Sequence, residues 1–102
     1  MLSLTALSEP TRQRIVEMLS HGPLSSGEIA RRFDASAPAI SQHLKTLRSA
    51  KLVRVRAEAQ RRIYELDPSG INEISAWVDE IRSFWATRLD ALQAQLKKEN
   101  QT

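Results

Sequence analysis

Hydrophobic residues in the first half of the chain recur every three or four positions, which is the spacing of one face of an α-helix. The first such stretch predicts a helix over about residues 9–21, with Ser8 as its N-cap and a Gly-Pro pair at its end. Two shorter helices are predicted next, with Ser25 and Ser36 as their N-caps. Only about three residues join them, so together they predict a helix-turn-helix over about residues 25–50.

The pattern then changes from helical spacing to strict alternation. Residues 52–57 and 61–66 each alternate in this way around a short polar connection, which predicts a β-hairpin over about residues 52–66. If the hairpin packs its aliphatic residues on the core, most of its arginines face outward. The expected inward residues are Val53, Val55 and Ile63. The expected outward residues are Arg54, Arg56 and Arg62, with Arg61 near the tip.

The last third of the chain returns to helical spacing and keeps it without interruption. Apolar residues follow one another at steps of three or four from Ile71 to Leu96, which predicts a helix over about residues 70–98. Such a helix is about 42 Å long, at about 1.5 Å per residue. A domain of this size cannot cover so long an apolar stripe, so we expect a second copy of the chain to cover it. The expected dimer contacts on this helix are Ile74, Trp77, Val78, Ile81, Phe84, Trp85, Leu89 and Leu92.

Length and composition support one folded domain spanning residues 1–102. The predicted elements make it an α+β domain that is mainly α: a winged helix-turn-helix with a two-stranded wing and a long C-terminal dimerisation helix. Hydrophobic residues make up 41% and charged residues 26% of the chain, as in globular proteins. No apolar run approaches the length of a membrane span, and the first residues do not resemble a signal peptide. Cysteine is absent, which excludes disulfides and thiolate metal sites. We therefore expect a cytoplasmic protein without a metal or another cofactor.

The positive charge is concentrated in the middle of the chain. The formal net charge is only +3, but residues 36–66 carry seven basic and two acidic side chains, a net charge of +5. The segments before and after carry 0 and −2. Because this charge coincides with the helix-turn-helix and the hairpin, it predicts double-stranded DNA as a partner.

The second helix of the helix-turn-helix has the side chains that a recognition helix needs. With its aliphatic residues turned inward, small and polar residues face outward, and the Gln42 amide can bond adenine bidentately. Lysine and arginine suit phosphates, as do the free backbone N–H groups at the helix N-terminus. For His43, a structural role is as well supported as DNA contact. The predicted DNA-binding residues are Ser36, Pro38, Ser41, Gln42, His43, Lys45, Thr46, Arg48, Arg54, Arg56, Arg61 and Arg62.

Three segments, residues 8–16, 36–47 and 62–68, resemble the ArsR/SmtB family of winged helix-turn-helix repressors. The resemblance covers roughly residues 4–96. It implies a homodimer that pairs through its first and last helices and binds a palindromic operator. On this basis Leu4 and Leu7 are also expected to be dimer contacts, and Ser41, Gln42 and His43 are expected to lie on the recognition helix.

The chain departs from the family pattern at several positions. The Cys-x-Cys motif of the family's metal sensors corresponds here to Ser25 and Gly27, and the last helix has no histidine for the family's second metal site. The usual glycine after the recognition helix is Lys51, and the usual glycine of the wing is absent. These departures indicate a branch that does not sense metals, and they leave the turn geometry open.

Two alternative functions are consistent with the sequence. One is a metal-responsive repressor that uses carboxylates with His21 or His43. The other is a helical interaction protein that does not bind DNA. An enzyme is disfavoured because Ser41 and His43 are two positions apart on one helix and point in different directions. The sequence identifies no effector; one could bind near Trp77 and Trp85, or none is needed.

Overall fold

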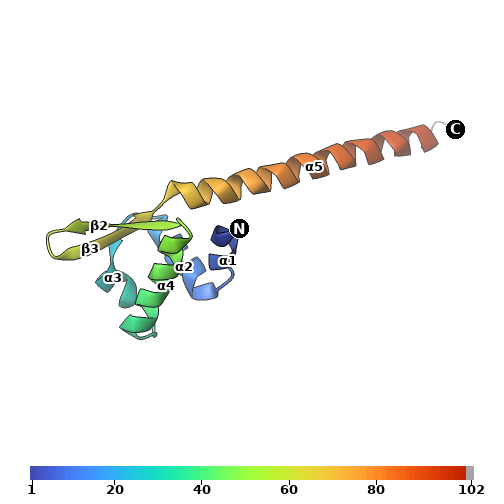
Figure 1. Ribbon diagram of the computed structural model, residues 1–102. Coiled ribbons are helices and arrows are strands. Elements are labelled where there is room, and N and C mark those ends of the chain that lie inside the picture. Colours follow the sequence, from blue (N-terminus) through green and yellow to red (C-terminus); the bar gives the residue numbers. More distant parts are fainter. Residues whose placement is uncertain (101–102) are drawn as a thin grey trace.

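The computed structural model describes residues 1–100 and has the predicted architecture (Figure 1). The four short helices and the sheet form a compact body, and the last helix extends away from it. This arrangement confirms a mainly helical winged helix-turn-helix. The elements are α1 (Leu2–Ala6), α2 (Pro10–Leu19), β1 (Leu24–Ser25), α3 (Ser26–Ala30), α4 (Ala37–Ser49), β2 (Val53–Glu58), β3 (Arg61–Leu66) and α5 (Pro68–Asn100).

The helix starts follow the predicted capping residues with one exception. At α3, Ser25 and Glu28 form a complete capping box, and at α4 the Ser36 hydroxyl accepts a hydrogen bond from the backbone N–H of Ala39 at 3.3 Å. The expectation for α2 is wrong: its N-cap is Glu9, which accepts from the Arg12 N–H at 2.9 Å, and not Ser8. This hydrogen bond is the main reason that the pKa of Glu9 is lowered.

Two elements are absent from the sequence-based prediction. The helix α1 is only five residues long, and β1 is only two residues long, so neither contains enough repeats to show a period. β1 pairs with β3, which makes a three-stranded antiparallel sheet in the order β1-β3-β2. The connection between α3 and α4 is also longer than the expected three residues, because α3 already ends at Ala30.

The register of the wing corrects the prediction of which side chains share a face. Val55 pairs with Tyr64, and Ala57 pairs with Arg62. Because directly paired residues of an antiparallel sheet lie on the same face, Arg62 shares a face with Val55 and Tyr64. Ile63 lies on the other face, opposite Arg56. Arg62 was expected beside Arg54 and Arg56, and that expectation is wrong.

The core lies between the helices of the body and one face of the sheet. The predicted inward face of α4 is confirmed: Ile40, Leu44 and Leu47 are at most 2% exposed. The other fully buried aliphatic side chains come from α2, α3, β2 and the turn before it, and they are Ile15, Ile29, Leu52 and Val53. Packing of α4 against this core fixes which of its sides faces solvent.

Lys51 adopts the left-handed backbone conformation, with φ at 58°, where the family usually has glycine. Its carbonyl accepts a hydrogen bond from the Gly70 N–H at 2.8 Å, which ties the end of α4 to the start of α5. In the wing, Ala59 takes the same conformation with φ at 56°, and it begins a two-residue turn without glycine. Both positions carry a steric cost that a glycine would not have.

Lys51→Gly is therefore expected to stabilise the protein by about 1 kcal/mol, because the left-handed conformation costs more for a residue with a Cβ than glycine loses in chain entropy. Urea unfolding followed by circular dichroism measures this change. Lys51→Ala is the control, since alanine removes the charge but keeps the Cβ, and it should give no such gain. If the Lys51→Gly variant is no more stable than wild type, the left-handed conformation of Lys51 carries no steric cost.

The helix α5 is far longer than the body can cover. Its 33 residues span about 50 Å. The radius of gyration is 20.1 Å, against about 13 Å for a compact domain of this length. After Val78, every described residue of α5 is exposed, including six large apolar side chains: Ile81, Phe84, Trp85, Leu89, Leu92 and Leu96.

Candidate nucleic-acid interface

One side of α4 and one side chain of the wing form a continuous polar surface. Its members are exposed and surround an open hollow of about 380 Å³ that Tyr64 also lines. No acidic residue lines this hollow. We call this surface the reading face, and it consists of Pro38, Ser41, Gln42, Lys45, Arg48 and Arg62. All six are among the predicted DNA-binding residues.

The other wing arginines lie away from the reading face and are paired with glutamates. Arg54 contacts Glu65 at 3.1 Å on the opposite side of the hairpin. Arg56, on the same side, contacts Glu58 at 2.9 Å. Exposed pairs of this kind contribute less than about 1 kcal/mol each, but they neutralise the arginine charge.

Arg61 is held by the body of the domain. Its guanidinium donates to Glu28 at 2.6 Å, and the same carboxylate oxygen accepts from the Ser25 N–H in the capping box. Hydrogen bonds from Ser25 are the largest cause that lowers the pKa of Glu28, and the Arg61 charge adds to them. Arg62 has no ion pair among residues 1–100, so it is the wing arginine that the structure leaves available on the side of α4.

His43 points toward α2 and not onto the reading face. Its Nδ1 lies 3.2 Å from the Arg12 guanidinium and 3.7 Å from the Glu9 carboxylate. Because the arginine guanidinium has only donors, the hydrogen bond forms when Nδ1 of the ring acts as the acceptor. The Arg12 Nε also donates to the Ala6 carbonyl at 2.6 Å. The contacts of His43 therefore join α4 to α2 through Arg12.

Two further predicted residues serve α4 itself. Ser36 caps its N-terminus, as described above. Thr46 is half-buried, and its hydroxyl donates to the Gln42 carbonyl at 3.1 Å. It lines a small apolar hollow with Leu2 and Ala6, away from the reading face. Tyr64 is not among the predicted residues, although its position two residues after Arg62 on a strand places both side chains on one face.

The predicted dimer contacts divide into two groups. Leu7 and Ile74 pack against the core of their own protomer, and Leu4 and Val78 are half-buried. The others are more exposed, from 37% for Ile81 to 56% for Phe84 and Trp85, and Leu2 of α1 is 72% exposed. The rings of Phe84 and Trp85 contact edge to face, with centroids 6.1 Å apart. The larger part of the stripe therefore has no covering group within the described protomer.

The positions that correspond to the family's metal-binding cysteines have other tasks here. Ser25 is buried and caps α3, and Gly27 follows in the first turn of that helix. Among residues 1–100, no three His, Cys, Asp or Glu side chains gather where they could hold a metal ion. None of the helices within this part of the chain is both long and apolar enough to cross a membrane.

A helix-turn-helix with an exposed polar second helix, followed directly by a hairpin with a free arginine on the same side, defines a winged helix-turn-helix DNA-binding domain. Comparison with known proteins agrees. Residues 7–56 match the family model described as "Helix-turn-helix domain". The chain is 48% identical to the HTH-type transcriptional regulator Rv2034 of Mycobacterium tuberculosis, over 82% of this chain and 76% of the relative. It is 33% identical to the transcriptional repressor SdpR of Bacillus subtilis, over 72% and 81% of the two chains.

Comparison with solved structures identifies the family of transcriptional regulators to which the chain is similar. The crystal structure called "Possible transcriptional regulator for arsenical resistance" is 41% identical, with a TM-score of 0.73 over 93% of this chain and 96% of that one. An ArsR family transcriptional regulator, 26% identical, has a TM-score of 0.78 over 83% and 93% of the two chains. The chain belongs to the ArsR family. It is a DNA-binding transcriptional regulator and not an enzyme.

Proposed function

We propose that the protein is a homodimeric repressor that binds a palindromic operator and needs no metal to do so. The observation that carries this proposal is the reading face, where five exposed residues of α4 and the unpaired Arg62 surround one hollow without an acidic side chain. Pro38 and Ser41 are small enough for α4 to enter the major groove, where Gln42 reaches base edges. Lys45, Arg48 and Arg62 then meet phosphates.

The dimer is proposed from the exposed stripe of α5. Two such helices packed together would cover the apolar side chains that one protomer leaves in water. A twofold dimer then presents two reading faces, which suits two half-sites about 34 Å apart. Repression follows if the dimer blocks polymerase at such an operator, and the cytoplasm is the proposed site of action. The relatives named as repressors agree with this role.

Fluorescence anisotropy with DNA from upstream of the protein's own gene tests the proposal. A shuffled duplex of the same length and composition is the control, and both are titrated at several salt concentrations. We expect tighter binding to the upstream DNA and a steep decrease of affinity with salt. Equal affinity for the two duplexes at every salt concentration would overturn the proposed sequence-specific function.

Arg62→Ala should weaken binding to every DNA sequence by about tenfold or more, because it removes a charge-assisted hydrogen bond to phosphate. The slope of log affinity against log salt should decrease by about one per subunit. Arg54→Ala removes the same charge from the opposite face of the hairpin, so its effect on affinity and slope should be smaller. Equal losses of DNA affinity in the two variants would show that binding does not depend on which face of the wing an arginine occupies.

Gln42→Ala should instead relax specificity. A bidentate contact to adenine contributes about 1–3 kcal/mol of discrimination at one base pair, and alanine cannot make it. Binding to a panel of operators with single substitutions measures this effect. Ser49→Ala is the matched control, because Ser49 is exposed on the same helix but its hydroxyl donates to the Lys45 carbonyl, outside the reading face. If the Gln42 variant discriminates like wild type, the base-reading role is wrong.

A further inference from the structure

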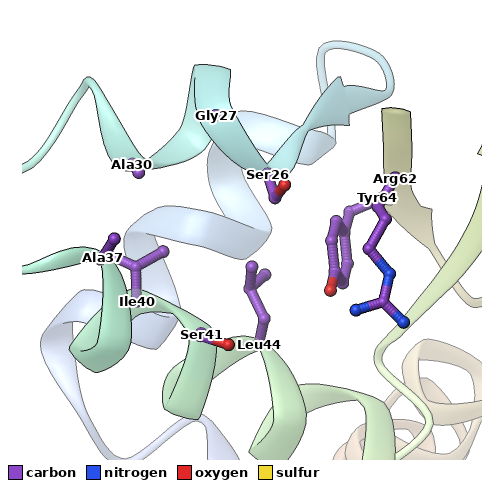
Figure 2. A pocket seen from close by; sticks show the side chains of 9 residues that line it. All are labelled: Ser26, Gly27, Ala30, Ala37, Ile40, Ser41, Leu44, Arg62 and Tyr64. Carbon is purple, nitrogen blue, oxygen red and sulfur yellow. The ribbon is translucent and has the colours of Figure 1, made fainter. Parts of the chain in front are cut away.

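A second cavity adjoins the reading face and lies between α3, α4 and β3 (Figure 2). Its volume is about 260 Å³. Small and aliphatic side chains form its apolar wall: Ala30 from α3, and Ala37, Ile40 and Leu44 from α4. In Figure 2, Tyr64 and Arg62 extend together from β3 toward α4 at one end of the cavity. The cavity therefore has an apolar body and a polar end.

Tyr64 brings a hydroxyl group to the polar end of the cavity. Only 6% of its surface is exposed, yet its hydroxyl has no hydrogen-bond partner among the residues that the structure describes. The hydroxyl oxygen itself remains in reach of solvent, because no fully buried side-chain oxygen or nitrogen in the described part of the chain lacks a partner. Because Tyr64 lines the cavity, its hydroxyl is free to donate to an acceptor oxygen of a ligand that enters there.

Charge at the polar end selects the kind of ligand. Arg62 has no ion pair within residues 1–100, and no Asp or Glu lines the cavity. Tyr64 and Arg62 are two positions apart on one strand, so both can donate to the same acceptor group. A guanidinium with a second donor beside it suits a carboxylate. The apolar wall suits a hydrocarbon or aromatic body, and the volume limits that body to one smaller than drug size.

We propose that this cavity binds a small organic acid, with the carboxylate on Arg62 and Tyr64 and the apolar body against Ile40 and Leu44. Arg62 also belongs to the reading face, so the acid and a DNA phosphate compete for one guanidinium. The acid is then an inducer that releases the protein from DNA, and by linkage DNA weakens acid binding by the same factor. This regulatory consequence rests on the proposed function, whereas binding of the acid does not.

NMR titration of the full chain with benzoate tests the binding step without DNA. We expect saturable shifts of the backbone amides of Ser26, Gly27 and Ala37, which line the cavity. The indole N–H signals of Trp77 and Trp85 should not move, which separates this cavity from a site between the long helices. Benzamide lacks the charge, and inorganic phosphate at equal ionic strength lacks the apolar body, so neither should reproduce the shifts.

Variants of the polar end identify the contacts. Arg62→Ala should weaken benzoate binding by about tenfold or more, as expected for loss of a charge-assisted hydrogen bond. Tyr64→Phe keeps the ring in the core and removes only the hydroxyl, and it should weaken binding several-fold. Arg32→Ala is the control: it removes the same charge from an exposed residue outside the cavity and should bind benzoate like wild type.

The outcomes separate the ligand site from the DNA function. Absence of saturable shifts at the cavity, or equal shifts with inorganic phosphate, would overturn the organic-acid site. Benzoate binding at the cavity without any sequence-preferring DNA binding would leave this site in place and overturn the proposed function alone. If the protein binds both, benzoate and not benzamide should release operator DNA in the anisotropy assay, and the Arg62→Ala variant should lose that response. Release by both compounds would contradict the inducer role.

Discussion

Replacing Leu89 and Leu92 together by aspartate is expected to give a monomer that binds operator DNA about 10²–10⁴-fold more weakly than wild type. The two side chains are 54% and 55% exposed, and they lie on the apolar stripe of α5 beyond the last contact of that helix with the body. In a dimer they would be buried, and two unpaired carboxylates at that position would be costly. A monomer has only one reading face and loses the gain in affinity from binding two half-sites at once.

Ser83→Asp is the control for this variant. Ser83 lies about 180° around α5 from the middle of the stripe, at about 100° per residue, so an added charge there should leave the dimer intact. Sedimentation measures the oligomeric state, and anisotropy measures DNA binding in the same samples. The leucine side chains make no contacts with the body, so circular dichroism should show a folded variant. A double variant that remains dimeric, or a wild-type protein that is monomeric, would contradict the proposed interface.

Gly70→Ala is expected to destabilise the protein by about 2–3 kcal/mol. A Cβ at position 70 would lie 2.5 Å from the Lys51 carbonyl oxygen and 3.0 Å from that of Ala50. Both are backbone atoms at the end of α4, so relief requires α5 to move away from the body. That movement would also break the hydrogen bond from the Gly70 N–H to Lys51. For a domain of this size the midpoint of thermal unfolding should fall by about 10–20 °C.

Gly27→Ala provides the matched comparison. The same added methyl group at position 27 meets only the Arg31 guanidinium, at 3.7 Å, which is ordinary contact. Alanine also favours a helix over glycine, so this variant should be unchanged or up to about 1 kcal/mol more stable. Both variants need to be measured at one protein concentration, because the proposed dimerisation would make the apparent stability depend on concentration. If the two variants unfold alike, close packing of α5 on the end of α4 is not important for stability.

Local patterns predicted most of the secondary structure because each of them depends on neighbouring residues. Helical spacing identified α2, α4 and α5, and the caps at Ser25 and Ser36 are confirmed because a cap is a contact across three residues. Alternation identified the hairpin. The period is not visible in α1 and β1, which are too short to repeat it. The prediction of Ser8 as the N-cap of α2 was wrong. The Ser8 and Glu9 side chains both have an oxygen that can accept from the helix N-terminus, and the sequence pattern does not show at which of these adjacent residues the helix begins.

The sequence by itself determined the class of the protein: a helix-turn-helix and a wing with concentrated positive charge, and an apolar stripe on the last helix too long for one protomer. Only the tertiary structure decided which of the predicted residues lie together. The wing register turned Arg62 toward α4 and left Arg54 and Arg56 on the other face, since alternation along one strand does not say which residue of the next strand it meets. The tertiary structure also places Arg61 in an ion pair with Glu28 of α3 and His43 in contact with Arg12 of α2. It also buries Tyr64 beside Arg62, because the packing of β3 against α3 and α4 depends on the whole chain and not on any local pattern.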